Sequence, residues 1–368
     1  MGNNPKAKVL WICLGALSLL LRYLVSGHSD WVERYYSRGL FVHIRSLLDL
    51  LFAWLPFPLL LPLSALLLFW LLRRLWRFGR RSMPWPQRLL RASFSLLSFL
   101  GATLFWFLFL WGFNYGRIPI ETQLALQPHA LDSAQIRQAL FTETDLLLRA
   151  RPTIPGADST ALNRKQLPPD LEAHIRPLVE AQLREMGYPA ASRLRARRLL
   201  PRGILLRIST AGFYLPFTGE CNLDAGLHPI QIPFVMAHEF AHGYGITDEG
   251  ACNFIAYLAC CRAPDGFIRY SGHYGYWRYL RSAFYRLAPD AFEAYLADLD
   301  PVLRTDARAV RKNSEAYPDL FPKFRNLTYD TYLKAQGVRE GLRSYNRVVL
   351  LVDAWRKTRE SETTLDTH

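Results

Sequence analysis

The chain has 368 residues, of which half are hydrophobic, and it carries a formal net charge of +14. Its mean hydropathy is zero because an apolar first third is balanced by a polar remainder. The positive charge does not indicate a nucleic-acid partner, since much of it lies in a short loop beside apolar segments, where charge normally sets membrane topology.

Three apolar stretches in the first third are each close to the ~20 residues that cross a bilayer as a helix. They comprise residues 7–26, 54–72 and 92–113. The first ends in LRYLVSG, which is not a clear cleavage site, so we interpret it as a retained anchor instead of a signal peptide. We therefore expect residues 1–113 to form a multi-pass membrane region with three transmembrane helices.

Positive charge predicts the orientation of these helices. The loop 73–91 holds seven arginines and no acidic residue, which is typical of a cytoplasmic loop. Lys6 and Lys8 place the N-terminus on the same side. Three crossings then leave everything after residue 113 outside the cytoplasmic (inner) membrane, and the lipid bilayer is an expected partner of the protein.

Residues 114–359 are long enough for one extracytoplasmic domain with a sizeable core. Amphipathic patterns predict helices at 131–151 and 169–187. The segment ILLRIS at 204–209 is the best strand candidate, which suggests a mainly α (α+β) domain with a small sheet. We expect the polar tail 360–368 to be disordered.

Residues 233–245, PFVMAHEFAHGYG, contain an H-E-x-x-H motif. On a helix, His238 and His242 are four residues apart and share a face, which lets two imidazoles bind one zinc ion. Zinc lowers the pKa of its water to about 7, and Glu239 is placed to act as the general base. The motif's neighbours are apolar nearly all round, which predicts a buried helix whose polar groups need a metal to satisfy them.

A catalytic zinc usually has a third protein ligand, and Asp248 and Glu249 both follow the motif. A metzincin arrangement with Asp248 requires a downstream methionine turn, but no methionine follows Met236. Glu249 begins a predicted helix on which it shares a face with Asn253, as in the E-x-x-x-D helix of gluzincins. There the first residue binds zinc and the second orients a ligand histidine, although Asn253 fits a plain helix-surface position equally well.

Five further residues are candidates for stabilising an oxyanion or lining the substrate cleft, by type and proximity in sequence only. A structural role is the simpler interpretation for four of them, and a turn-stabilising role fits the glutamate equally well. The candidates are Tyr214, Glu220, His228, His273 and Tyr274.

Several of these strings together resemble the DUF3810 family of bacterial membrane proteins. They are GFYLPFTGECN at 212–222, the H-E-x-x-H segment, and the E-x-x-x-N helix that follows it. WGFNYGRIP at 111–119 and YDTYLKAQGVREGLRSYNRVV at 329–349 agree in order and spacing. The family is taken to be zincin-like from its H-E-x-x-H, so the resemblance implies a zincin-like fold.

The resemblance also implies that the zinc ligands are those of the motif helix and Glu249, with Glu239 as the base and Asn253 beside a ligand. Two positions depart from the family pattern. Ala251 stands where an acidic residue is frequent, and Gly243 stands where Gln is expected after the second histidine. Neither position is a proposed ligand, so the predicted metal site is unaffected.

We therefore expect a multi-pass α-helical membrane anchor followed by a mainly α (α+β) zincin-like domain. The predicted function is a zinc metallopeptidase of gluzincin type that hydrolyses peptide bonds of envelope proteins or peptides. The alternative is a catalytically inactive zincin-like domain that binds a partner. The sequence favours Glu249 over Asp248 as the third ligand. It leaves open the substrate, the oligomeric state and the presence of disulfides among the five cysteines.

Overall fold

The computed structural model describes residues 4–80, 84–320 and 347–365, with side chains up to residue 360. The chain divides into two compact units. The first comprises residues 1–118 and 215–220, and the second comprises residues 119–214 and 221–368. The boundary after residue 118 falls five residues later than the apolar pattern predicted. The assignment of residues 215–220 to the first unit was not predicted from the sequence.

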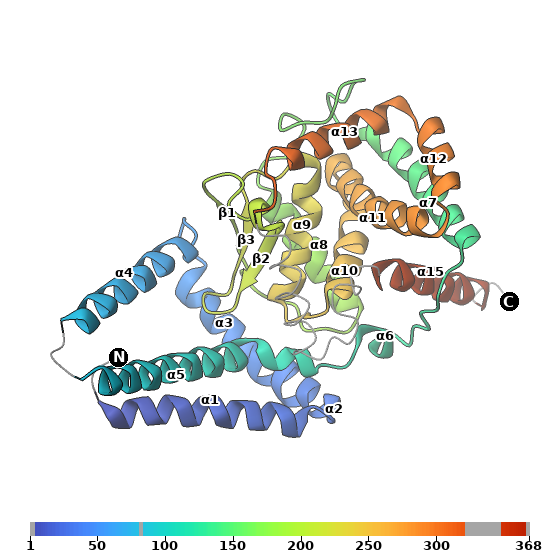
Figure 1. Ribbon diagram of the computed structural model, residues 1–368. Coiled ribbons are helices and arrows are strands. Elements are labelled where there is room, and N and C mark those ends of the chain that lie inside the picture. The colour runs from blue at the N-terminus through green and yellow to red at the C-terminus, as the bar shows by residue number, and fades with distance from the viewer. Residues whose placement is uncertain (1–3, 81–83, 321–346, 366–368) are drawn as a thin grey trace. The chain divides into compact units, whose positions relative to one another are not determined.

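The described part of the first unit is helical (Figure 1). Its elements are α1 (Pro5–Val25), α2 (Ser29–Trp31), the π-helix η1 (Val32–Leu40), α3 (Phe41–Phe52), α4 (Leu60–Gly79), α5 (Trp85–Leu110) and the 3-10 helix η2 (Gly112–Gly116).

Helices α1 and α5 are the two described helices that are long and apolar enough to cross a membrane. They lie side by side and run in the same direction. Two hydrogen bonds show this: Lys8 donates to Ser95 near the starts of the helices, and Arg22 donates to the Gly112 carbonyl near their ends. At the crossing, a Cβ atom on Gly15 would lie 2.6 Å from Gly101 Cα. Close backbone approach through small residues is typical of helix pairs in membranes.

Helix α4 differs from the expected second span, 54–72. It starts at Leu60, because Pro56 and Pro58 disfavour helix in the residues before them. Arg73, Arg74 and Arg77 lie in its last two turns, so α4 is less apolar than α1 and α5. Its start is capped by Glu220, whose Oε1 accepts the Leu59 N–H at 2.7 Å. The structure thus places this cleft candidate in a capping role.

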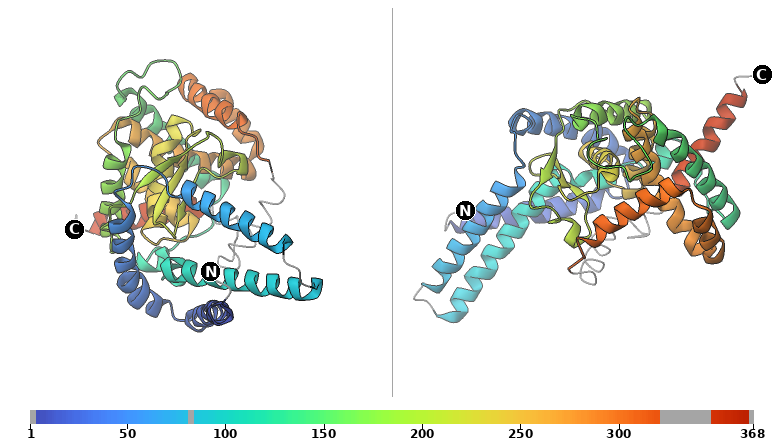
Figure 2. Two further views of the ribbon diagram at one scale, coloured as in Figure 1. Left: turned by 90° about the vertical axis from the view of Figure 1, so that its left-hand side faces the viewer. Right: turned by 90° about the horizontal axis from the view of Figure 1, so that it is seen from above.

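The second unit is mostly helical with a small sheet (Figures 1 and 2). Its helices before the sheet are α6 (Ile120–Gln123), α7 (Ser133–Ala150), η3 (Arg151–Thr153) and α8 (Leu171–Glu185). The later elements are η4 (Leu206–Ile208), η5 (Pro229–Gln231), α9 (Ile232–Gly243), α10 (Glu249–Cys261), α11 (Gly266–Leu287), α12 (Pro289–Asp298), α13 (Pro301–Glu315) and α15 (Arg347–Leu365). The helices predicted at 131–151 and 169–187 are confirmed as α7 and α8.

The sheet has three strands in the order β1-β3-β2, so β2 is an edge strand. The strands are β1 (Ala196–Leu199), β2 (Gly212–Leu215) and β3 (Glu220–Asp224). β1 runs parallel to β3, with Ala196 opposite Cys221 and Leu199 opposite Asp224. β2 and β3 form a hairpin. Helix α9 packs against β1, and α9, α10 and α11 pack on one another and contribute most of the fully buried aromatic side chains of this unit.

The strand predicted at 204–209 is wrong, because that segment forms turns and the single-turn helix η4. Asp224 is the reason. Its carboxylate accepts backbone N–H groups of Gly203 at 2.7 Å, Leu205 at 2.7 Å and Leu206 at 3.1 Å, which curls the segment around it. A buried carboxylate 15 or more positions away therefore overrides the local pattern.

The expected disorder from residue 360 is also wrong for residues 360–365, where α15 continues. The residues there are polar but include good helix formers such as Glu360, which continue a helix already started by the apolar segment before them. Residues 366–368, and residues 329–346 of the C-terminal family string, lie outside the described residues. All five cysteines are free thiols.

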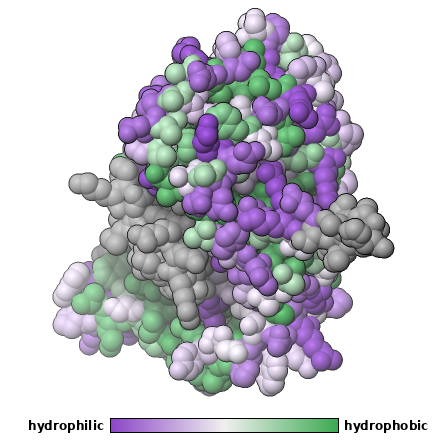
Figure 3. All heavy atoms as spheres, turned by 90° about the vertical axis from the view of Figure 1, so that its right-hand side faces the viewer, coloured by the Kyte–Doolittle hydropathy of each residue, from purple (hydrophilic) through white to green (hydrophobic). Residues whose placement is uncertain are grey.

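On the face shown in Figure 3, hydrophilic and hydrophobic residues are intermingled over the upper part of the view. Few large apolar side chains of the described second unit are exposed, among them Phe141 and Tyr285. In the first unit, by contrast, large apolar side chains of the long helices are exposed, such as Leu17 on α1, Leu66 on α4 and Leu100 on α5. The two units therefore present surfaces of different character to their surroundings.

Candidate metal centre

Helix α9 carries the whole H-E-x-x-H motif. It is one of the most buried helices of the second unit, and Glu239 and His242 are themselves buried. The helix ends at Gly243, and the chain turns at Gly245 with a positive φ of 85°. Packing explains why residue 243 is a glycine, since a Cβ atom there would lie 2.3 Å from Leu194 Cδ2. A glutamine at that position would not fit beside Leu194.

Both imidazoles are held through the same ring nitrogen. His238 Nδ1 lies 2.9 Å from Asn253 Oδ1, and His242 Nδ1 lies 2.8 Å from the Ile246 carbonyl oxygen. A carbonyl oxygen only accepts, so Nδ1 of each ring carries a proton, and Nε2 is the atom that a neutral ring leaves for a metal. The two Nε2 atoms face each other at 3.1 Å. The predicted contact of Asn253 with a ligand histidine is therefore present.

Glu249 brings a carboxylate oxygen to the same point. Its Oε2 lies 3.2 Å from His238 Nε2 and 3.7 Å from His242 Nε2. Asp248, the other candidate for third ligand, is the N-cap of α10, and its Oδ1 accepts the Ala251 N–H at 2.7 Å. The structure thus assigns the two neighbouring acids different positions, one as a helix cap and one within the histidine cluster.

The three ligand atoms have the spacing that a tetrahedral metal requires. Zinc bonds of about 2.0–2.1 Å meeting near the tetrahedral angle place neighbouring ligand atoms about 3.3 Å apart. The observed separations are 3.1, 3.2 and 3.7 Å. Among the described residues, His238, His242 and Glu249 form the one group of this kind close enough to share an ion. Their burial and chemistry fit a zinc ion.

The electrostatics of the cluster favour a cation. Burial by itself would raise the pKa of Glu249, but the adjacent imidazoles of His242 and His238 outweigh it and hold that pKa well below its usual range. The carboxylate is therefore ionised. The pKa of His242 is in turn raised well above its usual range, because burial lowers it but Cys252 and Glu249 outweigh that effect. The buried Glu249 carboxylate thus requires a positive charge beside it, which a proton on His242 or a metal ion can supply.

Glu239 points to the sheet. It is 4% exposed, and its Oε2 has no hydrogen-bond partner among the described residues. A Cβ atom on Gly212 of β2 would lie 3.0 Å from Glu239 Oε1, so the carboxylate occupies space that only glycine leaves open. Burial raises the pKa of Glu239. An orphaned, buried carboxylate next to a ligand histidine is suited to accept a proton from a bound water.

Of the five cleft candidates, Tyr214 is on β2 two residues after Gly212, so the two residues share a face of the strand. Glu220 caps α4, as described above. The other three have partners elsewhere in the unit. His228 Nδ1 accepts the Ile230 N–H at the start of η5, His273 Nδ1 bonds the buried Glu143 at 2.7 Å, and Tyr274 is buried among the aromatic rings of α11.

Tyr279 was missed in the sequence. It comes from α11, and its hydroxyl lies close enough to Asn253 and Glu249 for both to affect its pKa. Burial raises the pKa of Tyr279 to about 12, so the phenol stays neutral. No local pattern identifies this residue, since α11 carries several tyrosines at similar spacing and only packing selects one.

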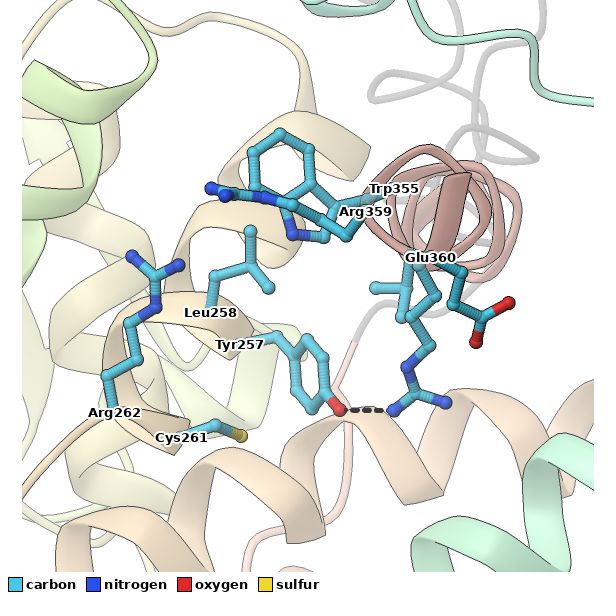
Figure 4. A pocket seen from close by; sticks show the side chains of 9 residues that line it. Tyr257, Leu258, Cys261, Arg262, Trp355, Arg359 and Glu360 are labelled. Carbon is cyan, nitrogen blue, oxygen red and sulfur yellow. Dashed lines mark hydrogen bonds between the residues drawn. The ribbon is translucent and has the colours of Figure 1, made fainter. Parts of the chain in front are cut away.

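A separate cavity of about 360 Å³ lies between α10 and α15 (Figure 4). It is lined by Tyr257, Leu258, Cys261, Arg262, Val352, Trp355, Arg356, Arg359 and Glu360, and none of these is a candidate metal ligand. Its arginines are already paired, since Arg356 bonds Glu143 and both Arg262 and Arg359 bond Glu185. The metal cluster and this cavity are therefore different places on α10.

Comparison with known proteins gives one result. No curated protein and no solved structure matches the chain. A family model described as a protein of unknown function, DUF3810, matches residues 36–352, which include the strings around the histidine cluster. The chain therefore belongs to the DUF3810 family.

Proposed function

We propose that this protein is a membrane-anchored zinc metallopeptidase of gluzincin type, which hydrolyses peptide bonds of envelope proteins or peptides. The observation that carries the proposal is the convergence of two imidazole Nε2 atoms and one carboxylate oxygen within 3.7 Å of one another, beside a buried carboxylate oxygen without a hydrogen-bond partner among the described residues. His238, His242 and Glu249 would hold the metal. When bound, the zinc supplies a Lewis acid that polarises the scissile carbonyl and acidifies water.

The remaining groups have roles set by their contacts. Glu239 accepts a proton from the attacking water and returns it to the leaving amine, a task suited to a carboxyl whose pKa burial has raised. Asn253 and the Ile246 carbonyl fix the tautomer of each histidine, so that both rings present Nε2. The strand β2 lies beside Glu239 and is at the edge of the sheet among the described strands, which is where an extended peptide chain can add.

The membrane anchor is proposed to have three crossings. Because α1 and α5 run in the same direction, a chain that crosses in both must return between them. Of the helices described between α1 and α5, α4 has the 20 residues and the exposed apolar side chains needed for that return. The arginines at the end of α4 favour a cytoplasmic position for the loop that follows it. The helices of the first unit would then cross the inner membrane, and the second unit would lie on its extracytoplasmic side.

Metal content tests the central claim. We expect the purified full-length protein to hold about one zinc per chain, and the His238→Ala variant to hold none, because two ligands do not retain zinc. His228→Ala is the matched control, since it removes an imidazole that is outside the cluster. A parent protein that holds no metal after purification without chelators would overturn the proposal.

Activity separates the enzyme from a binding module. With a mixture of internally quenched fluorogenic peptides as the probe, Glu239→Gln is expected to lower hydrolysis by about 10²–10⁴-fold while zinc content stays unchanged. If the parent holds zinc but cleaves no peptide in the mixture, the catalytically inactive zincin-like alternative is favoured. Loss of zinc in the Gln variant would contradict the role of Glu239 as a base.

A further inference from the structure

A strongly basic segment of the second unit is not used by the proposed catalytic site. Between residues 186 and 214 the chain has six arginines and no acidic residue. Arg195 and Arg207 are engaged, the first with Glu172 and the second over the ring of Tyr317. Arg198 and Arg202 are exposed and form no ion pair among the described residues. Arg198 and Arg202 therefore carry charge that no acidic side chain in the described part of the chain pairs with.

Exposed aliphatic side chains lie among these arginines, in the loop of residues 200–208. Leu200 is 61% exposed, Ile204 is 43% exposed and Ile208 is 42% exposed. A fourth, Leu320, is 55% exposed and its N–H bonds the Arg207 carbonyl at 2.8 Å. Single exposed aliphatic residues are ordinary, but four on adjoining segments form a patch.

The 200–208 loop holds these side chains in a fixed position. The Asp224 carboxylate binds backbone N–H groups on both sides of Ile204, namely those of Gly203 and Leu205. Leu205 itself is buried, so the loop is anchored inward while Leu200, Ile204 and Ile208 stay outside. Their exposure is thus built into the fold of the loop.

Arg198 and Arg202 stand on either side of Leu200 in the chain, and Arg164 is a third exposed arginine. Partial burial and then repulsion from Arg164 and Arg202 lower the pKa of Arg198, in agreement with a local excess of positive charge. Asp319, an acidic group at the far end of the loop, accepts a hydrogen bond from the Ser209 hydroxyl at 2.6 Å. The three arginines therefore offer a positive charge that can bind an anion.

We propose that the 200–208 loop, with Arg164 and Leu320, is a docking surface for an anionic lipid bilayer. Aliphatic side chains that enter the interfacial region and arginines that meet phosphate groups are the two elements of peripheral membrane binding. A nucleic acid would use the cations but leave four aliphatic groups in water, and the loop offers no exposed aromatic ring for base stacking. The surface is independent of the metal cluster.

Flotation of vesicles tests the surface on the full-length protein. The protein, held in nanodiscs of phosphatidylcholine, is mixed with vesicles of phosphatidylcholine alone or with added phosphatidylglycerol. We expect co-flotation with the anionic vesicles, and at least about a tenfold loss of binding in the triple variant R164Q/R198Q/R202Q. The variant L200S/I204S/I208S should also bind more weakly, because the aliphatic groups no longer enter the interface.

The matched control is R137Q/R286Q/R308Q, which removes the same charge from exposed positions on α7, α11 and α13. All variants keep the arginines of residues 73–91. Equal loss of binding in the control, or parent-like binding of the serine variant, would overturn the proposal in favour of a general charge effect. Tighter binding of a DNA duplex than of the vesicles would overturn it in favour of nucleic acid.

Hydrogen exchange on the unmodified protein gives a second measurement that does not depend on variant folding. Residues 198–208 are expected to exchange more slowly in nanodiscs that contain phosphatidylglycerol than in those of phosphatidylcholine alone. An unchanged exchange rate in this segment would contradict docking. The result is independent of zinc content, so failure of this proposal and failure of the peptidase proposal are distinguishable.

Discussion

The Asn253 amide oxygen lies 2.9 Å from His238 Nδ1, so a residue on α10 sets the proton position of a ring on α9. This contact predicts the effect of removing the amide. Asn253→Ala should weaken zinc binding by about 10–100-fold, because the His238 ring loses its orientation. Competition with a chelator measures the change. Asn253→Asp retains an accepting oxygen and serves as the control, and equal affinity of all three proteins would contradict the orienting role.

The neighbours Asp248 and Glu249 should behave differently when each is replaced by Ala. Glu249→Ala is expected to abolish stoichiometric zinc, since it removes the third ligand. Asp248→Ala should keep zinc and lower the free energy of unfolding by about 1 kcal/mol, the usual effect of losing an N-cap. Metal analysis and chemical denaturation distinguish the two. The opposite pattern would make Asp248 the ligand.

Gly212 predicts a link between the sheet and the catalytic base. A Cβ atom there would lie 2.8 Å from the Asn222 carbonyl oxygen and 3.0 Å from Glu239 Oε1. Gly212→Ala should therefore displace the Glu239 carboxylate and lower peptide hydrolysis by about tenfold or more, with zinc retained. Gly156→Ala at an open surface turn is a control for general backbone strain. Unchanged hydrolysis would place the base elsewhere.

The crossing of α1 and α5 depends on Gly15 and Gly101. Gly15→Leu forces a large side chain against the Gly101 backbone and should lower the unfolding temperature of the detergent-solubilised protein. Leu17→Ala, at a half-exposed position of the same helix, should have little effect. A thermal shift followed by fluorescence compares them. Equal stability of both variants would exclude this helix pairing.

Cys260 predicts a pH dependence of thiol reactivity. Its side chain is fully buried, and burial raises the pKa of its thiol. A raised pKa keeps the group protonated, so Cys260 should resist alkylation at pH 9, where a free thiol of pKa about 8.5 is mostly thiolate. Mass spectrometry after maleimide treatment, with and without denaturant, measures this. Labelling of Cys260 in the folded protein would show that the helix opens.

The chain by itself determined those features that depend on local spacing. Residues four apart on a helix share a face whatever surrounds them, so the pairing of His238 with His242 and of Glu249 with Asn253 followed from the sequence. The amphipathic helices α7 and α8 were predicted for the same reason. The apolar segments that form α1 and α5 could also be identified from the sequence, because the thickness of a bilayer sets a minimum number of consecutive apolar residues.

Only the tertiary structure decided which distant groups meet. The sequence could not separate Asp248 from Glu249 with certainty, because that choice depends on how α10 approaches α9. It also placed a strand at 204–209, since the Asp224 carboxylate that curls this loop acts from another element. Likewise, the sequence made Glu220 a cleft candidate, whereas in the structure its carboxylate accepts a backbone N–H at the start of α4. Buried polar groups must find partners wherever packing puts them, and packing is not a local property of the chain.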